Sequence, residues 1–86
     1  MGATHKKEKI RLNKIEQFRE DIKIAIKVKE GMMNRVSEII ESCVKNDPVA
    51  FADQILSNAE ELCRLKNEII NLKANLYMLD ALAEDE

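Results

Sequence analysis

Apolar residues recur at alternating steps of three and four over the first half of the chain, where residues 8–44 contain no proline. This spacing is typical of a heptad repeat on an α-helix. We expect a helix over about residues 8–45, with Ile15 at an a position, Phe18 at d, and Lys29 in the one polar place of the stripe. The apolar members are Ile15, Phe18, Ile22, Ala25, Met32, Val36, Ile39 and Cys43.

A second stripe with the same spacing follows Lys45-Asn46-Asp47-Pro48. Asp47 suits a helix N-cap and Pro48 suits the first helical position, so a second helix is expected over about residues 48–83. Its stripe comprises Phe51, Ile55, Asn58, Leu62, Leu65, Ile69, Leu72, Leu76, Leu79 and Ala83.

The two stripes fit together when the chain folds back at residue 47. Facing residues, such as Cys43 with Phe51 and Ile15 with Leu79, then have numbers that sum to 94, and every a position meets a d position. The sequence therefore predicts an all-α fold, an antiparallel two-helix coiled-coil hairpin. Residues 1–7 are expected to be a disordered start or a remnant added for expression, and residues 84–86 an acidic tail.

Three residues interrupt this regular pattern. Lys29 and Asn58 are polar residues in the stripes, where they can set the register of the pairing. Lys29 can instead lay its methylenes on Leu65, or contact a partner directly. Gly31 lies within a helix at a cost of about 1 kcal/mol relative to alanine, so close approach of another surface is one explanation for it.

Large apolar residues are also found outside the two stripes. We expect them to form one continuous strip along a single side of the hairpin, and a soluble monomer rarely leaves such a strip bare. A second copy, another segment of the parent protein or another protein could cover it, or it could be a widened core. The strip comprises Ile26, Met33 and Ile40 at e positions, and Val49, Leu56, Cys63, Ile70 and Tyr77 at b positions.

Charge and cysteine placement narrow the range of functions. Residues 1–29 carry nine Lys/Arg against four Asp/Glu (+5), whereas residues 30–86 carry five against twelve (−7). The two halves can attract each other, or the basic half can contact an acidic partner or a phosphate backbone.

Cys43 and Cys63 are expected about 18 Å apart, which indicates reduced thiols in a cytoplasmic protein.

The sequence contains no recognisable catalytic, phosphate-binding or metal-binding motif. His5 has no acid or thiol in a fixed relation to it, and the chain has no phosphate-binding loop and no metal-ligand spacing. We therefore expect no enzyme, no cofactor and no small-molecule substrate. The pattern favours a protein partner over nucleic acid, with membrane contact only indirect.

The tract from Ile22 to Gly31 resembles the first-helix signature of the homology-region-1 repeats of Rho effectors, such as protein kinase C-related kinases, rhotekin and rhophilin. Those repeats typically read Lys-x-Lys-Glu-Gly-Ala; Lys27, Lys29, Glu30 and Gly31 match, and Met32 replaces the alanine. The second helix, from Asp47-Pro48 through Leu65-Lys66 to Leu76, is similar to the related repeat of F-BAR adaptors. The resemblance covers roughly residues 14–80 and implies an antiparallel finger that binds a GTP-bound Rho-family GTPase, with nucleotide and Mg²⁺ held by the partner.

Three functional hypotheses follow. The first is a GTPase-binding module, the second a self-associating hairpin that forms a homodimeric four-helix bundle as a scaffold, and the third a basic surface over Lys6–Lys29 for membrane or nucleic acid. For the first we expect the partner-binding residues to be Lys23, Ile26, Lys27, Lys29, Gly31, Met33, Ile40, Leu56, Cys63, Ile70 and Tyr77.

Overall fold

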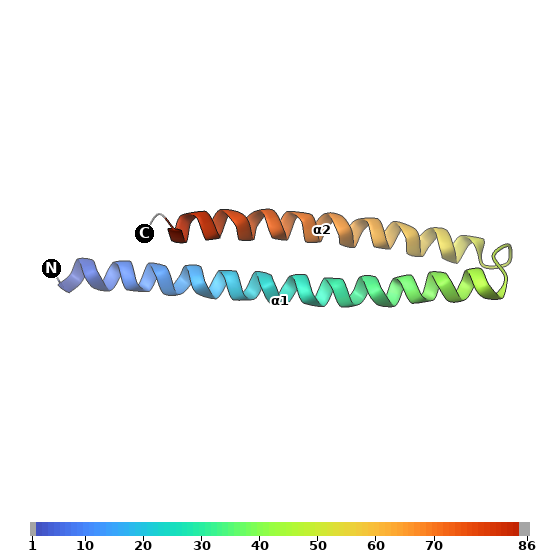
Figure 1. The fold of residues 1–86 in the computed structure, drawn as a ribbon, viewed down its shortest axis with the longest axis horizontal. Helices are drawn as coiled ribbons and strands as arrows, with labels where there is room; N and C mark the ends of the chain where they lie inside the picture. Colours follow the sequence, from blue (N-terminus) through green and yellow to red (C-terminus); the bar gives the residue numbers. More distant parts are fainter. Residues whose placement is uncertain (1, 85–86) are drawn as a thin grey trace.

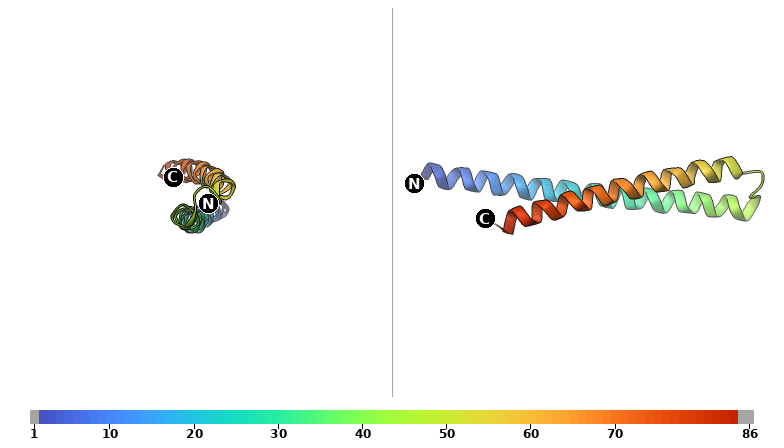
Figure 2. Two further views of the ribbon diagram at one scale, coloured as in Figure 1. Left: turned by 90° about the vertical axis from the view of Figure 1, so that its right-hand side faces the viewer. Right: turned by 90° about the horizontal axis from the view of Figure 1, so that it is seen from above.

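Two long helices make up the fold. The computed structural model describes the backbone of residues 2–84 and the side chains of residues 13–84. Helix α1 spans Gly2–Asn46 and helix α2 spans Ala52–Glu84. They run antiparallel, side by side (Figure 1), and cross at a shallow angle when seen from above (Figure 2). The predicted all-α helical hairpin is confirmed.

Helix α1 is longer than expected. It begins at Gly2, whereas the sequence placed its start near Glu8. With 45 residues against 33 in α2, α1 is about 18 Å longer, and its first turns extend past the end of α2 (Figure 1). Met1 and the last two residues of the expected acidic tail lie outside the described residues.

Asp47 organises the turn between the helices. Its Oδ1 accepts hydrogen bonds from the backbone N–H groups of Val49 (3.2 Å) and Ala50 (3.1 Å), as an N-cap side chain does. The residues that follow form a single turn, closed by a 3.0 Å bond from the Phe51 N–H to the Asp47 carbonyl. The regular helix α2 therefore begins at Ala52, four residues after the expected Pro48.

This turn sets the register of the hairpin. A connection over residues 47–51 is centred on Val49, which pairs residues whose numbers sum to 98. The cross-helix contacts agree: the sums are 97 for Lys29–Glu68 and Cys43–Gln54, and 99 for Arg19–Asp80. The predicted sum of 94 is wrong, because it placed the start of the second helix at Pro48 and so centred the turn on Asp47.

The new register changes which side of α1 faces α2. Phe18 and Ile39, both predicted to lie in the seam, are 57% and 48% exposed. Ile26 is only 8% exposed, and Met33 and Ile40 are half-buried. The seam of α1 is therefore turned toward its e positions, although Ala25 and Met32 at d positions stay half-buried. A sum of 98 puts Met33 opposite Leu65 and Ile26 opposite Leu72.

The seam of α2 agrees with the prediction. Each of its ten members, from Phe51 to Ala83, is buried or half-buried. Leu65 is fully buried and Ile69 nearly so, which places the best-packed part of the hairpin at mid-length. Asn58 does not bond across the seam within the described residues, since its amide donates to the Gln54 carbonyl of its own helix at 2.8 Å.

The hairpin has a narrow core. Four apolar side chains are buried among residues 13–84: Ile15, Ile26, Leu65 and Ile69. The molecule measures 70 × 14 × 14 Å. Its accessible surface of 6822 Å² exceeds the roughly 5,200 Å² of a globular monomer of 9.9 kDa. Many large apolar side chains consequently stay in contact with solvent.

The register can be tested with the native thiol of Cys43. In a Cys63→Ser background, Ile55→Cys should form an intramolecular disulfide with Cys43 under mild oxidation, because the two positions face each other when the sum is 98. Phe51→Cys, the matched control, should react more slowly. The rates are measured by peptide mass spectrometry after proteolysis, and faster reaction at position 51 would instead support the sum of 94.

Gly31 offers a test of helix packing. A Cβ at this position would meet nothing within 4 Å, so the hairpin itself does not require glycine there. Gly31→Ala should raise the free energy of unfolding by about 1 kcal/mol, because alanine loses less backbone entropy in a helix. Urea unfolding followed by circular dichroism measures this change. Ala74→Gly, an exposed mid-helix site on α2, should show the reverse change, and a loss of stability in Gly31→Ala would contradict the expectation.

Candidate functional site

A ridge of exposed apolar side chains runs along α2. It consists of Leu56, Cys63, Ile70 and Tyr77, which occur at every seventh residue and so lie on one side of the helix. Ile70 is 52% exposed and Tyr77 is 77% exposed. The ridge, which we call the α2 ridge, extends over about 32 Å. Val49, also expected in this strip, lies in the turn and is exposed.

The expected continuous strip across both helices is not present. Ile26, Met33 and Ile40, its α1 members, lie in the seam between the helices. The reason is the register, which turns the e positions of α1 toward α2. The α1 half of the strip is therefore core, whereas the α2 half remains open to a partner.

Beside the α2 ridge, the two helices form an open hollow of about 580 Å³. Its apolar surface comes from Ile24, Ile26 and Leu76, and its rim is charged. The charged residues are Glu20, Lys23, Lys27 and Glu30 of α1 and Lys73 of α2. We call this feature the lysine-rimmed hollow.

A network of charged side chains lies on the other side of the seam. Lys29 Nζ donates to Glu68 Oε2 at 2.9 Å, and Arg64 bonds both Glu68 (2.6 Å) and Glu61. On α2, Glu61 and Glu68 each come one position before a seam residue, whereas the lysines at 66 and 73 each come one position after a seam residue. The glutamates and the lysines therefore lie on opposite sides of the seam. Lys29 is thus engaged within the hairpin.

The charged network changes the pKa values of its side chains. The hydrogen bond from Lys29 is the main cause that holds the pKa of Glu68 below its ordinary value, and the charge of Arg64 adds to it. The hydrogen bond from Arg64 likewise lowers the pKa of Glu61. The same bond, which Arg64 donates to Glu61, raises the pKa of Arg64, which therefore stays charged.

A second cross-helix ion pair lies near the open end of the hairpin. Arg19 takes a seam position that was expected for Phe18, and its Nε lies 2.7 Å from Asp80 Oδ1. The Arg19 Nε and Asp80 Oδ1 atoms are both shielded from solvent, and neither has hydrogen-bond geometry with a described residue. The contact is therefore an ion pair, which holds the end of α2 against α1.

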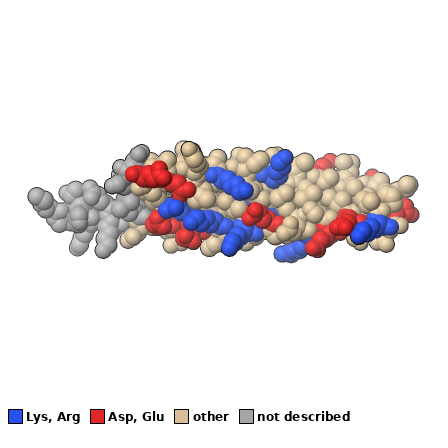
Figure 3. Space-filling model, in the orientation of Figure 1, with Lys and Arg blue, Asp and Glu red and all other residues tan. Residues whose placement is uncertain are grey.

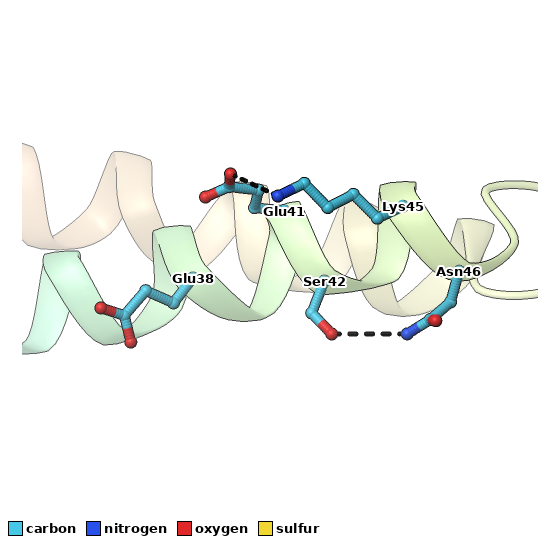
Figure 4. A pocket seen from close by; sticks show the side chains of 5 residues that line it. All are labelled: Glu38, Glu41, Ser42, Lys45 and Asn46. Carbon is cyan, nitrogen blue, oxygen red and sulfur yellow. Dashed lines mark hydrogen bonds and ion pairs between the residues drawn. The ribbon is translucent and has the colours of Figure 1, made fainter.

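A polar hollow of about 340 Å³ lies on the outer surface of α1 near the turn (Figure 4). All of its lining residues come from this one helix: Glu38, Glu41, Ser42, Lys45 and Asn46. Glu41 pairs with Lys45 at 3.2 Å, and Asn46 donates to Ser42 Oγ at 3.5 Å. These contacts are ordinary pairs one helical turn apart on the surface of a single helix.

Charge is unevenly spread over the face drawn in Figure 3. Lys and Arg side chains gather near the middle of the hairpin on both helices, whereas a broad area nearer the turn carries no charge. No group of three metal-binding side chains occurs among the described residues.

The expected site residues separate into distinct groups. Lys23 and Lys27 border the lysine-rimmed hollow, Lys29 joins the Glu68 network, and Gly31 has open space above it. Cys43 is half-buried and Cys63 is exposed on the α2 ridge, and both are free thiols.

The sequence interpretation did not include four residues of this surface among the expected site residues: Ile24, Lys66, Lys73 and Leu76. Lys66 and Lys73 could have been found from their spacing of seven beside the α2 ridge.

Comparisons with models of protein families, with curated proteins and with solved structures find no match. No helix among the described residues is long and apolar enough to cross a membrane.

The charged network predicts a loss of stability in acid. The pKa of Glu68 is lower in the folded chain than in the unfolded chain, where it is about 4.3. The ionised carboxylate therefore contributes its full stabilisation of the fold only above that pH. It is lost as the pH falls through the lower folded pKa. Thermal unfolding followed by circular dichroism should show a smaller loss of Tm for Glu68→Gln than for the original chain when the pH is lowered through this range. An equal loss in the two chains would contradict the role of Glu68.

Proposed function

We propose that this hairpin is a protein-binding coiled-coil module whose partner contacts the α2 ridge. The observation that carries this proposal is the exposure of Leu56, Ile70 and Tyr77 at heptad spacing, which the hairpin does not use for its own core. Large apolar side chains aligned over several turns are typical of interfaces rather than of solvated surface. Aromatic anchors such as Tyr77 are also common in interface cores.

We further propose that the partner is a Rho-family GTPase in its GTP-bound form. The support is the Lys-x-Lys-Glu-Gly tract, which resembles the first helix of homology-region-1 repeats. Lys27 of this tract is exposed, and the space above Gly31 is open, so both are accessible to another protein. Lys29 is the exception, since it is held by Glu68, and it would serve the fold rather than the interface.

The GTPase proposal is tested by a pull-down with GTP-loaded and GDP-loaded Rho-family proteins. Stronger capture of the GTP-bound form is expected, and Ile70→Asp should reduce it at least about tenfold, because a buried unpaired charge at an interface costs several kcal/mol. Helix content should be unchanged, since Ile70 lies outside the seam. Ile39→Asp is the matched control, because Ile39 is similarly exposed but belongs to α1, away from the α2 ridge.

Two results would contradict the proposal. Equal capture of both nucleotide states, or no capture, would exclude the effector role. A collapse of helix content in Ile70→Asp would show that Ile70 belongs to the core.

A second copy of the chain is the alternative partner for the α2 ridge. Its heptad spacing suits packing against another helix, as in a four-helix bundle. Sedimentation equilibrium distinguishes the two cases: a dimer whose population depends on concentration and on Ile70→Asp supports self-association. A monomer at tens of micromolar argues against it.

A further inference from the structure

The lysine-rimmed hollow joins apolar and basic surface in one place. Ile26 is 8% exposed and Leu76 is half-buried, so both form the base, whereas Ile24 is largely exposed at one side. Together with the rim residues they border an open hollow of about 580 Å³, which is enough for one or two large side chains of a partner. The hollow lies over the boundary of α1 and α2 and therefore exists only in the folded hairpin.

The rim carries positive charge that the hairpin leaves unused. Lys27 and Lys73 form no ion pair with any side chain of residues 13–84, and Lys23 is 3.7 Å from Glu20. The chain as a whole carries 14 Lys/Arg and 16 Asp/Glu, a net charge of −2. A local basic site on an acidic molecule attracts and orients an acidic partner.

The α2 ridge borders the same basic surface as the hollow. Ile70 lies between Lys66 and Lys73, four residues after the first and three before the second, so the three side chains are neighbours on the helix surface. Lys66, like Lys73, has no ion pair among the described residues. An apolar side chain flanked by lysines on adjacent turns is complementary to an apolar side chain flanked by carboxylates.

We propose that the lysine-rimmed hollow binds an acidic amphipathic helix of a partner protein. One apolar side chain of that helix enters the hollow against Ile26 and Leu76. Carboxylates on its adjacent turns pair with Lys27 and Lys73, and the helix continues along Ile70. This inference rests on the proposed protein-binding function and does not depend on the partner being a GTPase.

The features of the hollow favour a protein over an anionic membrane. Glu20 and Glu30 belong to the same rim and would be repelled by a lipid surface. The site is also concave, whereas membrane-binding helices present a convex apolar face. Basic surface for nucleic acid usually includes aromatic residues, and the residues that line the hollow include none.

The test uses the full chain and two synthetic peptides. Both are short amphipathic helices with identical leucines; the first carries glutamate at every polar position and the second carries lysine. Fluorescence anisotropy should show that the acidic peptide binds and that its affinity falls as salt is raised. The basic peptide should not bind.

Paired variants locate the contact. Lys27→Glu with Lys73→Glu should weaken binding of the acidic peptide at least about tenfold, because two attractive charges become repulsive. Lys14→Glu with Arg35→Glu changes the net charge equally at exposed positions outside the hollow, and should leave the affinity nearly unchanged. Ile24→Ser should weaken binding by removing the apolar side of the hollow. Circular dichroism verifies that each variant keeps its helix content.

Specific results would overturn the inference. These are equal binding of the two peptides, no binding of the acidic peptide, equal effects of the two double variants, or binding of phosphatidylserine vesicles in place of the peptide. The outcome is separable from the GTPase proposal. Peptide binding without GTPase capture would leave this inference standing, and GTPase capture that is unaffected by Lys27→Glu with Lys73→Glu would place the GTPase elsewhere.

Discussion

The hydrogen bonds of the Asp47 side chain fix the turn, and the turn fixes which residues of the two helices meet. By accepting hydrogen bonds from the N–H groups of Val49 and Ala50, the carboxylate caps the single turn between the helices, and the regular helix α2 begins after that turn at Ala52. In an antiparallel pair, displacement of the turn's centre by two residues changes every pairing along the helices. The burial of Ile26 and the exposure of Phe18 both follow from this local geometry.

The ion pairs between the helices are consistent with this register and help to specify it. Lys29 with Glu68 and Arg19 with Asp80 connect α1 to α2 at two separate levels. Single ion pairs near a surface contribute little stability, so their main effect is on which pairing is preferred. A charged residue in the seam that finds its partner in one register is left unpaired in another.

The narrow core explains why so much apolar surface remains. A pair of helices can bury one stripe of each, and the stripe of α1 is formed by Ile22, Ile26, Met33 and their neighbours. The α2 ridge, with Ile70 and Tyr77, has no helix of this chain to cover it. The chain therefore presents an apolar ridge beside a basic hollow, and the proposed binding of a partner helix rests on this arrangement.

The sequence by itself determined the fold class, the antiparallel topology and the seam of α2, because these depend on heptad spacing and on the break at Asp47-Pro48. It also identified Ile70 and Tyr77 as residues outside the core. The tertiary structure decided the register, the division of the expected strip and the position of the lysine-rimmed hollow. The physical reason lies in α1, where two sets of residues flank the shared a positions. The set that faces α2, Arg19, Ile26, Met33 and Ile40, is nearly as apolar as the set that was expected to, Phe18, Ala25, Met32 and Ile39. Periodicity cannot choose between two such stripes, and the geometry of a five-residue turn can.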